Sequence, residues 1–306
     1  MEGMVVQKSS RDVRVETESG LLLCSLRGKL RAEGREGSPV VAGDRVLVSD
    51  LGKGQAVIEK ILPRKSELTR ATAGGRRRVV AANVDSVLVV VAARDPEPRW
   101  PLVDRMLVAA ERQGLEPAVC VNKWDLVTPG DAQLESLLGL YRDLKYTVFA
   151  ASARLGQGVE DLAGWLRMRV TVFSGHSGVG KTTLLSRLRP DLEFSTVEVN
   201  PVTGKGRHTT SFVRFVKLPG GGYAVDTPGF REFQLVELRP EELGRYYREF
   251  REISGSCRYA DCLHRTEPEC AVRAGVDRGI ISKIRYENYL HVLSALPGSP
   301  GHGSRN

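Results

Sequence analysis

The sequence predicts a chain of several folded parts: a small all-β module, a larger α/β domain with a parallel sheet, and a helical module that carries a cluster of cysteines and a histidine. Short alternating apolar and polar segments fill about the first 65 positions, which is typical of a small barrel. From Ala81 onward, apolar strand-like segments alternate with amphipathic helical ones, which predicts parallel βαβ units. The cluster lies between Cys257 and Cys270, with helical segments on both sides.

Length and composition exclude several classes of protein. A chain of 306 residues suggests about two domains of ~150 residues, and 41% hydrophobic with 27% charged residues argues against wholesale disorder. The longest purely apolar run, Val87–Ala93, is far shorter than the ~20 residues of a membrane span. Met1–Ser10 lacks the apolar region of a secretory signal, and five cysteines, an odd number, favour a reducing compartment. We therefore expect a cytoplasmic protein with no membrane partner.

Positive charge is concentrated at the start of the chain. Lysine and arginine exceed aspartate and glutamate by 45 to 37, and the first 80 residues hold 16 of the basic and 10 of the acidic ones. A basic module on a nearly neutral body suggests a polyanionic partner, with nucleic acid ahead of membrane. A solvated basic surface with no partner explains the charge equally well.

The elements of the β module can be placed individually. Val13–Thr17, Leu21–Leu26 and Val46–Ser49 alternate apolar and polar residues, with glycine-containing turns between them. The glycine- and arginine-rich stretch 74–78 is typical of a flexible connection. These patterns predict a barrel over residues 1–68 and a basic linker over 69–80.

The predicted α/β domain spans residues 81–236. Ser86–Ala92 is a continuous β-branched run, as expected for a strand buried on both faces, and the apolar face of Leu102–Ala110 predicts a helix that stops at Gly114. The remaining expected elements are strand Ala118–Val121, helix Leu134–Leu144, strand Tyr146–Ala150, helix Val159–Leu166, and strands Val170–Phe173, Ser211–Leu218 and Tyr223–Val225. Helices over Pro240–Glu252 and Gly279–Leu296 predict a helical module at 237–296, followed by a disordered tail at 297–306.

The segment Gly175–Thr182 fits the pattern Gly-x4-Gly-Lys-Ser/Thr, and it lies between a predicted strand and a predicted helix. Glycines let successive backbone N–H groups surround phosphate oxygens, Lys181 reaches the β- and γ-phosphates, and the Thr182 hydroxyl binds Mg²⁺. We interpret His176 as contributing its backbone only. The expected nucleotide contacts are Gly175, His176, Ser177, Gly178, Val179, Gly180, Lys181, Thr182 and Thr183.

A second phosphate-side motif, Asp226-Thr-Pro-Gly229, follows the strand Tyr223–Val225. Asp226 can hold Mg²⁺ through water, and the Gly229 N–H can donate to the γ-phosphate. The motif is weak alone because aspartate and glycine are common in turns. Its position 45 residues beyond Lys181 makes the pair convincing.

Base recognition is predicted at Asn122-Lys123-Trp-Asp125, directly after a strand. A carboxylate at Asp125 can accept hydrogen bonds from the guanine N1–H and 2-amino group, a donor pair that adenine lacks. Ser152 and Ala153 follow the next strand, where a backbone N–H could reach the guanine O6. Asn122 and Asp125 argue against the alternative of an ATP-using P-loop enzyme.

The cluster Cys257-x4-Cys262-x-His264-x5-Cys270 has the composition of a structural zinc site. Three thiolates and one imidazole close a tetrahedral shell and leave no position for water, so we expect one structural Zn²⁺ per chain. Cys24 and Cys120 lie in apolar strand patterns and are predicted to be core residues.

The order of the motifs carries a family resemblance. The chain resembles the translation-factor-related GTPases, but its Asn-Lys-x-Asp and Ser-Ala motifs precede the P-loop, a His208-Thr209-Thr210 segment and the Asp226 motif. That order indicates a circular permutation, which loop joints tolerate when the strands stay packed. Together with the β module and the metal cluster, it resembles one family over about residues 1–296: the ribosome small-subunit-dependent GTPases called RsgA.

The resemblance implies a fold and a function. It implies an N-terminal oligonucleotide-binding fold, a circularly permuted P-loop GTPase domain and a C-terminal zinc-binding helical domain. It also implies GTP hydrolysis stimulated by the 30S ribosomal subunit, 16S rRNA binding and a late role in maturation of that subunit. We expect a monomer; a nucleotide-sensing RNA-binding scaffold with incidental hydrolysis is the alternative.

Catalytic roles are also suggested by the resemblance. Phe230 stands where many GTPases have a glutamine that orients water, so the family members resemble slow enzymes that need an activator. His208 is the candidate for the missing role, with contact to a phosphate or a partner as its alternative. Lys181 and Thr210 complete the expected catalytic set, and Thr210, or else Thr209, is the expected γ-phosphate-sensing Mg²⁺ ligand.

Overall fold

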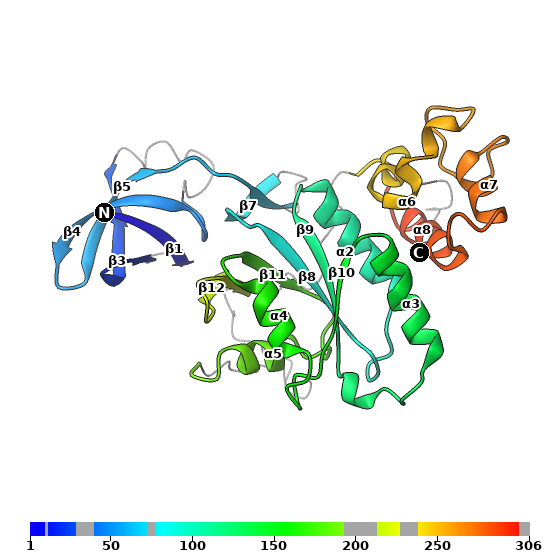
Figure 1. Ribbon diagram of the computed structural model, residues 1–306. Helices are drawn as coiled ribbons and strands as arrows, with labels where there is room; N and C mark the ends of the chain where they lie inside the picture. Colours follow the sequence, from blue (N-terminus) through cyan, green and yellow to red (C-terminus); the bar gives the residue numbers. More distant parts are fainter. Residues whose placement is uncertain (10–11, 29–39, 72–76, 193–212, 227–237, 300–306) are drawn as a thin grey trace, which may run out of the picture. The chain divides into compact units, whose positions relative to one another are not determined.

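The computed structural model describes residues 1–9, 12–28, 40–71, 77–192, 213–226 and 238–299 (Figure 1). Its residue contacts divide the chain into two compact units, each built from segments that are distant in sequence. The first unit comprises Met1–Val87, Gly156–Phe173 and Lys181–Arg231. The second comprises Leu88–Leu155, Ser174–Gly180 and Glu232–Asn306. The α/β part of the sequence therefore contributes to both units.

The first unit begins with a closed barrel (blue in Figure 1). Its strands are β1 (Glu2–Lys8), β2 (Val13–Thr17), β3 (Gly20–Leu26), β4 (Arg45–Gly52) and β5 (Gln55–Ile61). They pair in the order β1-β2-β3-β5-β4, and β4 pairs again with β1, which closes the ring. The pairing of β3 with β5 is parallel and the others are antiparallel. The predicted small barrel is confirmed. Its strands β1 and β5 are additional to the three strands that the alternating pattern predicts.

Alternation along the strands builds the barrel core. Val13 and Val15 of β2 are buried and Arg14 between them is exposed, as expected for a strand with one face inside. Val5, Val15, Val46 and Ile58 have no exposed surface and pack in one apolar cluster. A barrel of this kind leaves no unpaired strand edge among its own strands.

A two-stranded hairpin follows the barrel. Its strands β6 (Glu67–Ala71) and β7 (Arg77–Ala82) pair antiparallel, and Ala42 forms an isolated parallel bridge with Ala81. The region expected to be a basic linker, 69–80, thus includes part of both strands, and residues 72–76 lie outside the described residues. Backbone pairing, which the arginine-rich composition does not reveal, orders the ends of this region.

A buried carboxylate ties the barrel to the hairpin. Asp44 has no exposed surface, and it accepts hydrogen bonds from the Val41 N–H (2.8 Å) and from the Arg64 Nε (2.7 Å). Arg64 also donates to Glu67 at the start of β6 (2.8 Å). The Asp44 carboxylate raises the pKa of Arg64 above its ordinary value, although partial burial of the guanidinium opposes this. Both oxygens of the buried Asp44 side chain therefore have hydrogen-bond donors.

The rest of the first unit is α/β. Strands β11 (Val170–Ser174) and β13 (Tyr223–Asp226) pair in parallel, and β12 (Arg214–Lys217) pairs antiparallel to β13. Helices α4 (Val159–Leu166) and α5 (Lys181–Leu188) contact each other. β12 also pairs with the barrel at Gln7↔Arg214, and Glu16 of β2 accepts hydrogen bonds from Lys217 and from the Tyr223 hydroxyl (2.9 Å). These contacts join the barrel to β12 and β13.

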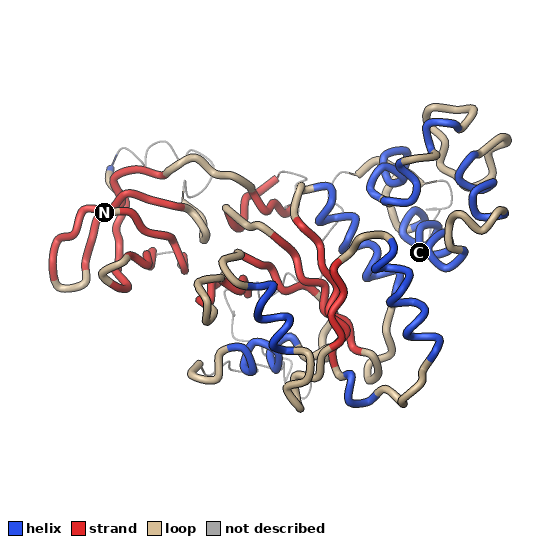
Figure 2. Tube along the Cα trace, viewed as in Figure 1, coloured by secondary structure: helices blue, strands red, loops and turns tan. Residues whose placement is uncertain are grey.

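The second unit contains the other half of the α/β sequence, whose helices are blue and whose strands are red in Figure 2. It holds most of β8 (Ser86–Ala92), β9 (Glu116–Asn122), β10 (Thr147–Ala150), α2 (Trp100–Arg112), the short η1 (Trp124–Leu126) and α3 (Ala132–Asp143). β9 lies between β8 and β10 and pairs in parallel with β10. Every residue of β8 is buried, as its continuous apolar sequence predicts. The predicted strands and helices of this region are confirmed to within about two residues.

The same unit ends in a helical module (orange and red in Figure 1). It consists of η2 (Pro240–Tyr246), α6 (Arg248–Arg251), η3 (Ser254–Ser256), α7 (Ala271–Asp277) and α8 (Lys283–Ser294). The helical structure predicted for Pro240–Glu252 is confirmed, but it is divided into η2 and α6. Tyr247 has an extended backbone (φ −92°, ψ 116°), which separates the 3₁₀ turns of η2 from the single turn of α6. Among the described residues, no helix is both long and apolar enough to cross a bilayer.

Replacement of Asp44 should selectively weaken the barrel. In the Asp44→Ala variant, Arg64 loses its buried counter-charge and the Val41 N–H loses its acceptor, a change that costs about 3–5 kcal/mol in comparable buried pairs. Amide hydrogen exchange in β4 and β5 should therefore accelerate strongly. The matched control is Glu59→Ala, which removes the acidic partner of the exposed Arg27. Equal protection of the β4 and β5 amides from exchange in the two variants would contradict the stabilising role of Asp44.

Candidate functional site

Within the second unit, three loops predicted to bind a nucleotide meet at the ends of strands. β9 ends at Asn122, the strand β10 leads to Ser152 and Ala153, and the segment 175–180 follows β11. In open α/β sheets, ligands bind beyond the carboxyl ends of the strands, where such loops gather. The structure therefore brings together the base-recognition motifs and the glycine-rich part of the P-loop.

Asn122 holds these loops to one another. Its side chain is buried, its Oδ1 accepts a hydrogen bond from the Ala153 N–H (3.0 Å), and its Nδ2 donates to the Val179 carbonyl (2.9 Å). Gly180 is so close that an added Cβ would lie 2.3 Å from Asn122 Nδ2. Both ends of one amide are thus used to fix the Ser-Ala loop and the P-loop against the end of β9.

Asp125 is fixed by its neighbours. The Ser152 hydroxyl donates to Asp125 Oδ1 (2.5 Å), and that same hydroxyl oxygen accepts from the Leu155 N–H (3.1 Å). The Trp124 N–H donates to the Ala151 carbonyl (3.0 Å), which ties η1 to the end of β10. The carboxylate is half-buried, so it can accept further hydrogen bonds from a planar ring with adjacent donors.

Lys123 takes a left-handed backbone (φ +61°) at the start of η1. Its ammonium donates to the carbonyl of Asp95, in the loop that connects β8 to α2. No sequence motif identified Asp95, because a backbone carbonyl acts independently of the side chain that carries it. Pro96 of the same loop would lie 3.8 Å from a Cβ placed on Gly178.

The glycines of the P-loop are required by the space around them and by their backbone angles. Gly175 has φ +150°, and a Cβ there would lie 2.1 Å from the Val90 carbonyl oxygen. Gly178 and Gly180 have φ of +80° and +92°, a region that favours glycine. Helix α5 begins at Lys181, so Thr182 and Thr183 occupy its first turn, where free N–H groups favour an anion. The donor set fits a phosphate group.

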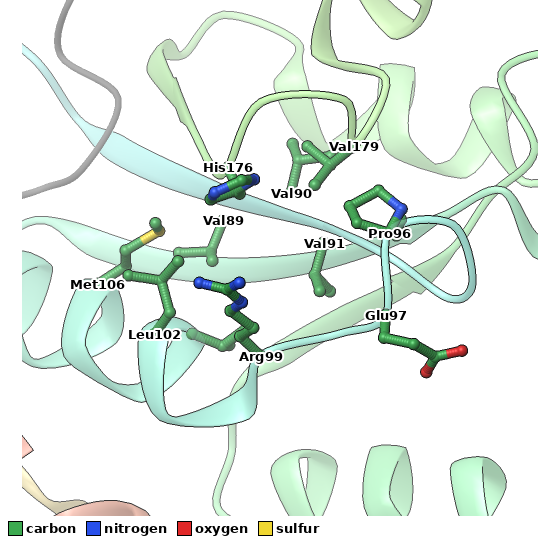
Figure 3. Close-up of a pocket in the computed structure, with 12 residues that line it drawn as sticks. Val89, Val90, Val91, Pro96, Glu97, Arg99, Leu102, Met106, His176 and Val179 are labelled. Atoms are coloured by element: carbon green, nitrogen blue, oxygen red, sulfur yellow. The ribbon is translucent and has the colours of Figure 1, made fainter. Parts of the chain in front are cut away.

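A small cavity lies beside the P-loop in the second unit (Figure 3). Its volume is about 160 Å³, and its walls come from β8, from α2 with the loop before it, and from His176 and Val179 of the P-loop. The walls are mainly apolar, with Glu97 and Arg99 as the charged members, and neither Asn122 nor Asp125 contributes. The cavity therefore borders the predicted phosphate contacts at His176 and Val179 but does not include these two base-recognition residues.

Some predicted site residues cannot be placed in this geometry. His208, Thr209, Thr210, Gly229 and Phe230 lie outside the described residues. Asp226 is the last residue of β13, and its backbone pairs with Arg214.

The predicted metal ligands Cys257, Cys262, His264 and Cys270 come together in the helical module. One ligand atom from each lies within 4.8 Å of all the others. The His264 Nδ1 lies 3.6 Å from the Cys257 Sγ and 3.5 Å from the Cys270 Sγ. A tetrahedral Zn²⁺ with ordinary bond lengths would separate its nitrogen and sulfur ligands by about 3.6 Å. The donor set and its spacing therefore fit zinc.

Burial shapes the proton affinity of these ligands. It raises the pKa of the Cys262 thiol to about 12, raises that of Cys270, and lowers the pKa of His264 below its ordinary value. In the absence of a cation the thiols of Cys262 and Cys270 are therefore protonated at neutral pH. Metal binding here must displace thiol protons, which makes occupancy dependent on pH.

A buried asparagine that joins the Asn-Lys-x-Asp loop, the Ser-Ala loop and a P-loop defines a guanine-nucleotide-binding protein, and the motif order along the chain makes it a circularly permuted one. The family model for the RsgA GTPase matches residues 61–236. The chain belongs to this family and is accordingly a GTP hydrolase.

Relatives over nearly the whole length agree. The proteins named small ribosomal subunit biogenesis GTPase RsgA from Bacteroides fragilis (strain YCH46) and Azotobacter vinelandii are 38% and 41% identical to this chain. Each match covers 96% of this chain, with 96% of the first relative and 85% of the second.

Solved structures show the same fold. The crystal structure of YjeQ from Thermotoga maritima superimposes with a TM-score of 0.81 at 37% identity, covering 98% of this chain and 99% of that one. YloQ, described as a circularly permuted GTPase, gives 0.75 at 28% identity, covering 96% and 93%. The predicted combination of barrel, permuted GTPase domain and helical module with a metal cluster is confirmed.

Loss of the metal should unfold the segment around the cluster. Residues 257–270 form no helix or strand, so metal binding contributes folding free energy to this segment. The purified chain should contain about one zinc per molecule, and chelation should accelerate amide exchange in residues 257–276 while the barrel stays protected. Cys262→Ala should lose the metal, and Cys24→Ala, a buried thiol in the barrel, should retain it. Equal metal content in the two variants would rule out the assigned site.

Proposed function

We propose that this protein hydrolyses GTP to GDP and phosphate as an assembly factor of the small ribosomal subunit, that the 30S subunit stimulates its turnover, and that it binds 16S rRNA. The proposal includes its action as a monomer in the cytoplasm. The observation that carries it is the Asn122 amide, which links the base-recognition loop to the P-loop. The relatives of similar length are named as small ribosomal subunit biogenesis GTPases, which supports the ribosomal part.

Guanine specificity is assigned to the loops around Asn122. Asp125, held by Ser152, would accept the N1–H and 2-amino hydrogens of guanine, and the Ser152–Ala153 loop would offer a backbone N–H to the O6. The Lys123 ammonium is held by the Asp95 carbonyl. Adenine offers no such donor pair, so Asp125 would be left unpaired and ATP would bind poorly.

The phosphates are assigned to residues 175–183, with Lys181 at the β- and γ-phosphates. Mg²⁺, when bound, neutralises charge that develops on the phosphate oxygens. Thr182 in the first turn of α5 and Thr210 would hold it, Asp226 would reach it through water, and Gly229 would donate its N–H to the γ-phosphate. Cys257, Cys262, His264 and Cys270 would hold the structural zinc.

The RNA-binding role is assigned to the barrel. The first 80 residues hold 16 basic and 10 acidic side chains, and most of this excess lies in residues 62–80, directly after the barrel strands, where it suits a polyanion bound beside the barrel. Its contacts with β12 and β13 join it to the strand that follows residues 193–212 and to the strand that ends at Asp226. Through these contacts, a nucleotide-dependent shift of β12 or β13 would change the position of the barrel.

Base specificity can be tested with Asp125→Asn. An amide cannot accept two hydrogen bonds from guanine, because one of its groups is a donor, so GTP affinity should fall at least about 100-fold. Xanthine carries a carbonyl in place of the 2-amino group, and xanthosine triphosphate should bind the variant better than GTP does. Nucleotide titrations measure both affinities. Asp143→Asn, an exposed carboxylate at the end of α3, is the matched control, and loss of GTP affinity there as well would discredit the assignment.

The activation model predicts a large rise in GTP turnover when 30S subunits are added, and no such rise with 50S subunits. We assign His208 as the residue that orients or deprotonates the attacking water, since Phe230 cannot form the hydrogen bond. His208→Ala should therefore bind GTP normally but lose most of the stimulated rate, by a factor of about 100 or more. Steady-state phosphate release checks both statements. Equal rates with and without 30S would refute activation, and a fully active variant would exclude His208.

A further inference from the structure

An arginine side chain is buried between α8 of the helical module and α2 of the GTPase part. Arg285 is the largest of the fully buried side chains in the described part of the chain, with 1% of its surface exposed. Its guanidinium donates to Asp104 of α2 and to Glu249 of α6, the latter at 2.7 Å. The rings of Tyr141 and Tyr247 lie 5.3 and 4.7 Å from its central carbon. One cation on α8 thus contacts residues of three other helices, α2, α3 and α6, and Tyr247 between η2 and α6.

The carboxylate opposite Arg285 is equally enclosed. Asp104 has no exposed surface, and it accepts further hydrogen bonds from the Tyr141 hydroxyl (2.7 Å) and from Asn288 Nδ2 of α8 (2.7 Å). Burial lowers the pKa of Arg285, but Asp104 and Glu249 more than offset this and hold it well above its ordinary value. Removal of one partner from a buried pair of this kind is strongly unfavourable, so the pair fixes the position of α8 on α2.

A second contact lies two turns along the same face of α2. Glu111, seven residues after Asp104, accepts from Arg248 (2.6 Å) and Arg251 (2.7 Å) of α6. Arg248 also donates to the Lys145 carbonyl (2.6 Å), just beyond the end of α3. Two fixed points along one helix prevent the module from sliding or rotating on α2.

The other contacts of α8 lead to the metal cluster. The Tyr286 hydroxyl donates to the carbonyl of His264 (2.7 Å), and the Tyr289 hydroxyl donates to the carbonyl of Leu263 (2.8 Å). His264 is one of the four metal ligands, and its ring lies 6.0 Å from that of Tyr289. Two tyrosines of α8 therefore bind the segment that carries His264. Arg285 and Asn288 of the same helix bind Asp104 of α2.

The contacts of α2 lead to the P-loop. Leu102 and Met106 line the same small cavity as His176 and Val179 (Figure 3). The Ser174 hydroxyl, directly before the P-loop, donates to the Met106 sulfur (3.5 Å). A displacement of α2 would therefore also displace the P-loop.

We propose that Arg285 and Asp104 are positioning residues that couple the metal cluster to the nucleotide site through α8 and α2. Metal occupancy fixes the His264 segment, that segment fixes α8, and the buried pair fixes α2 beneath the P-loop. Zinc and guanine nucleotide then bind with positive cooperativity. Because linkage is reciprocal, each ligand must strengthen the binding of the other by the same factor. The inference rests on the proposed function, which supplies both ligands.

The test compares the full-length chain in its zinc-loaded and chelator-stripped forms. Titration with GDP should give an affinity at least about fivefold weaker for the stripped form. Competition with a chelator should show that GDP tightens zinc binding by a matching factor. Equal GDP affinity in the two forms would overturn the coupling. If the loaded wild-type chain binds no GDP at all, it is the proposed function that fails.

Asp104→Asn tests the route without requiring a metal-free protein. The amide keeps the size of the side chain and one oxygen acceptor but removes the charge opposite Arg285. The loaded variant should still bind zinc, while the effect of GDP on zinc release should shrink towards none. Lys283→Gln, at an exposed lysine on the same helix, is the matched control and should retain the full effect. A full GDP effect in Asp104→Asn would overturn the role of the pair, whatever the stability of the stripped form.

Discussion

The side-chain amide of Asn122 is the interaction on which the nucleotide site depends. It is buried at the end of β9, it receives the Ala153 N–H, and it donates to the Val179 carbonyl. A buried amide must have its hydrogen bonds made, because an unsatisfied donor or acceptor in the interior costs about 1–3 kcal/mol. Satisfying it requires the Ser-Ala loop and the P-loop to be in place together. The arrangement of the loops that we propose for base and phosphate binding thus follows from one satisfied polar group.

Helices and strands with a regular apolar pattern are the ones that the sequence predicts correctly. The buried strand Ser86–Ala92 and the helix Val159–Leu166 have strong periodicities and were located correctly. β1 and β5 were not located, because partly exposed residues weaken their alternation and their stability comes from ring closure. The region Pro240–Glu252 looks helical in composition, but tertiary packing of Tyr247 and Phe250 around the metal cluster breaks it into short turns.

The site was predictable where a motif fixes both chemistry and spacing. The four metal ligands and the loops around Asn122 and Gly180 are where their motifs imply. Backbone partners such as the Asp95 carbonyl cannot be predicted from the sequence, because any residue type provides a carbonyl. The burial of Arg285 was equally unpredictable from the sequence. A charged residue in a helix is usually exposed, and only the tertiary structure shows that Asp104 lies opposite it. Pairings across 181 residues of chain require the tertiary structure.

The pairing of β1 with β12 has a consequence for the order in which the chain is made. All barrel pairings lie within the first 61 residues, so the ring can close soon after β5 leaves the ribosome. Its partner Arg214, however, is 207 positions beyond Gln7, and Tyr223, which also contacts the barrel, is translated later still. At synthesis rates of about 5–20 residues per second, the nascent barrel is folded for some ten seconds or more before its docking strand exists. The barrel, tethered by the growing chain, is therefore folded beside the translating ribosome before the strands that it contacts in the finished protein have been made.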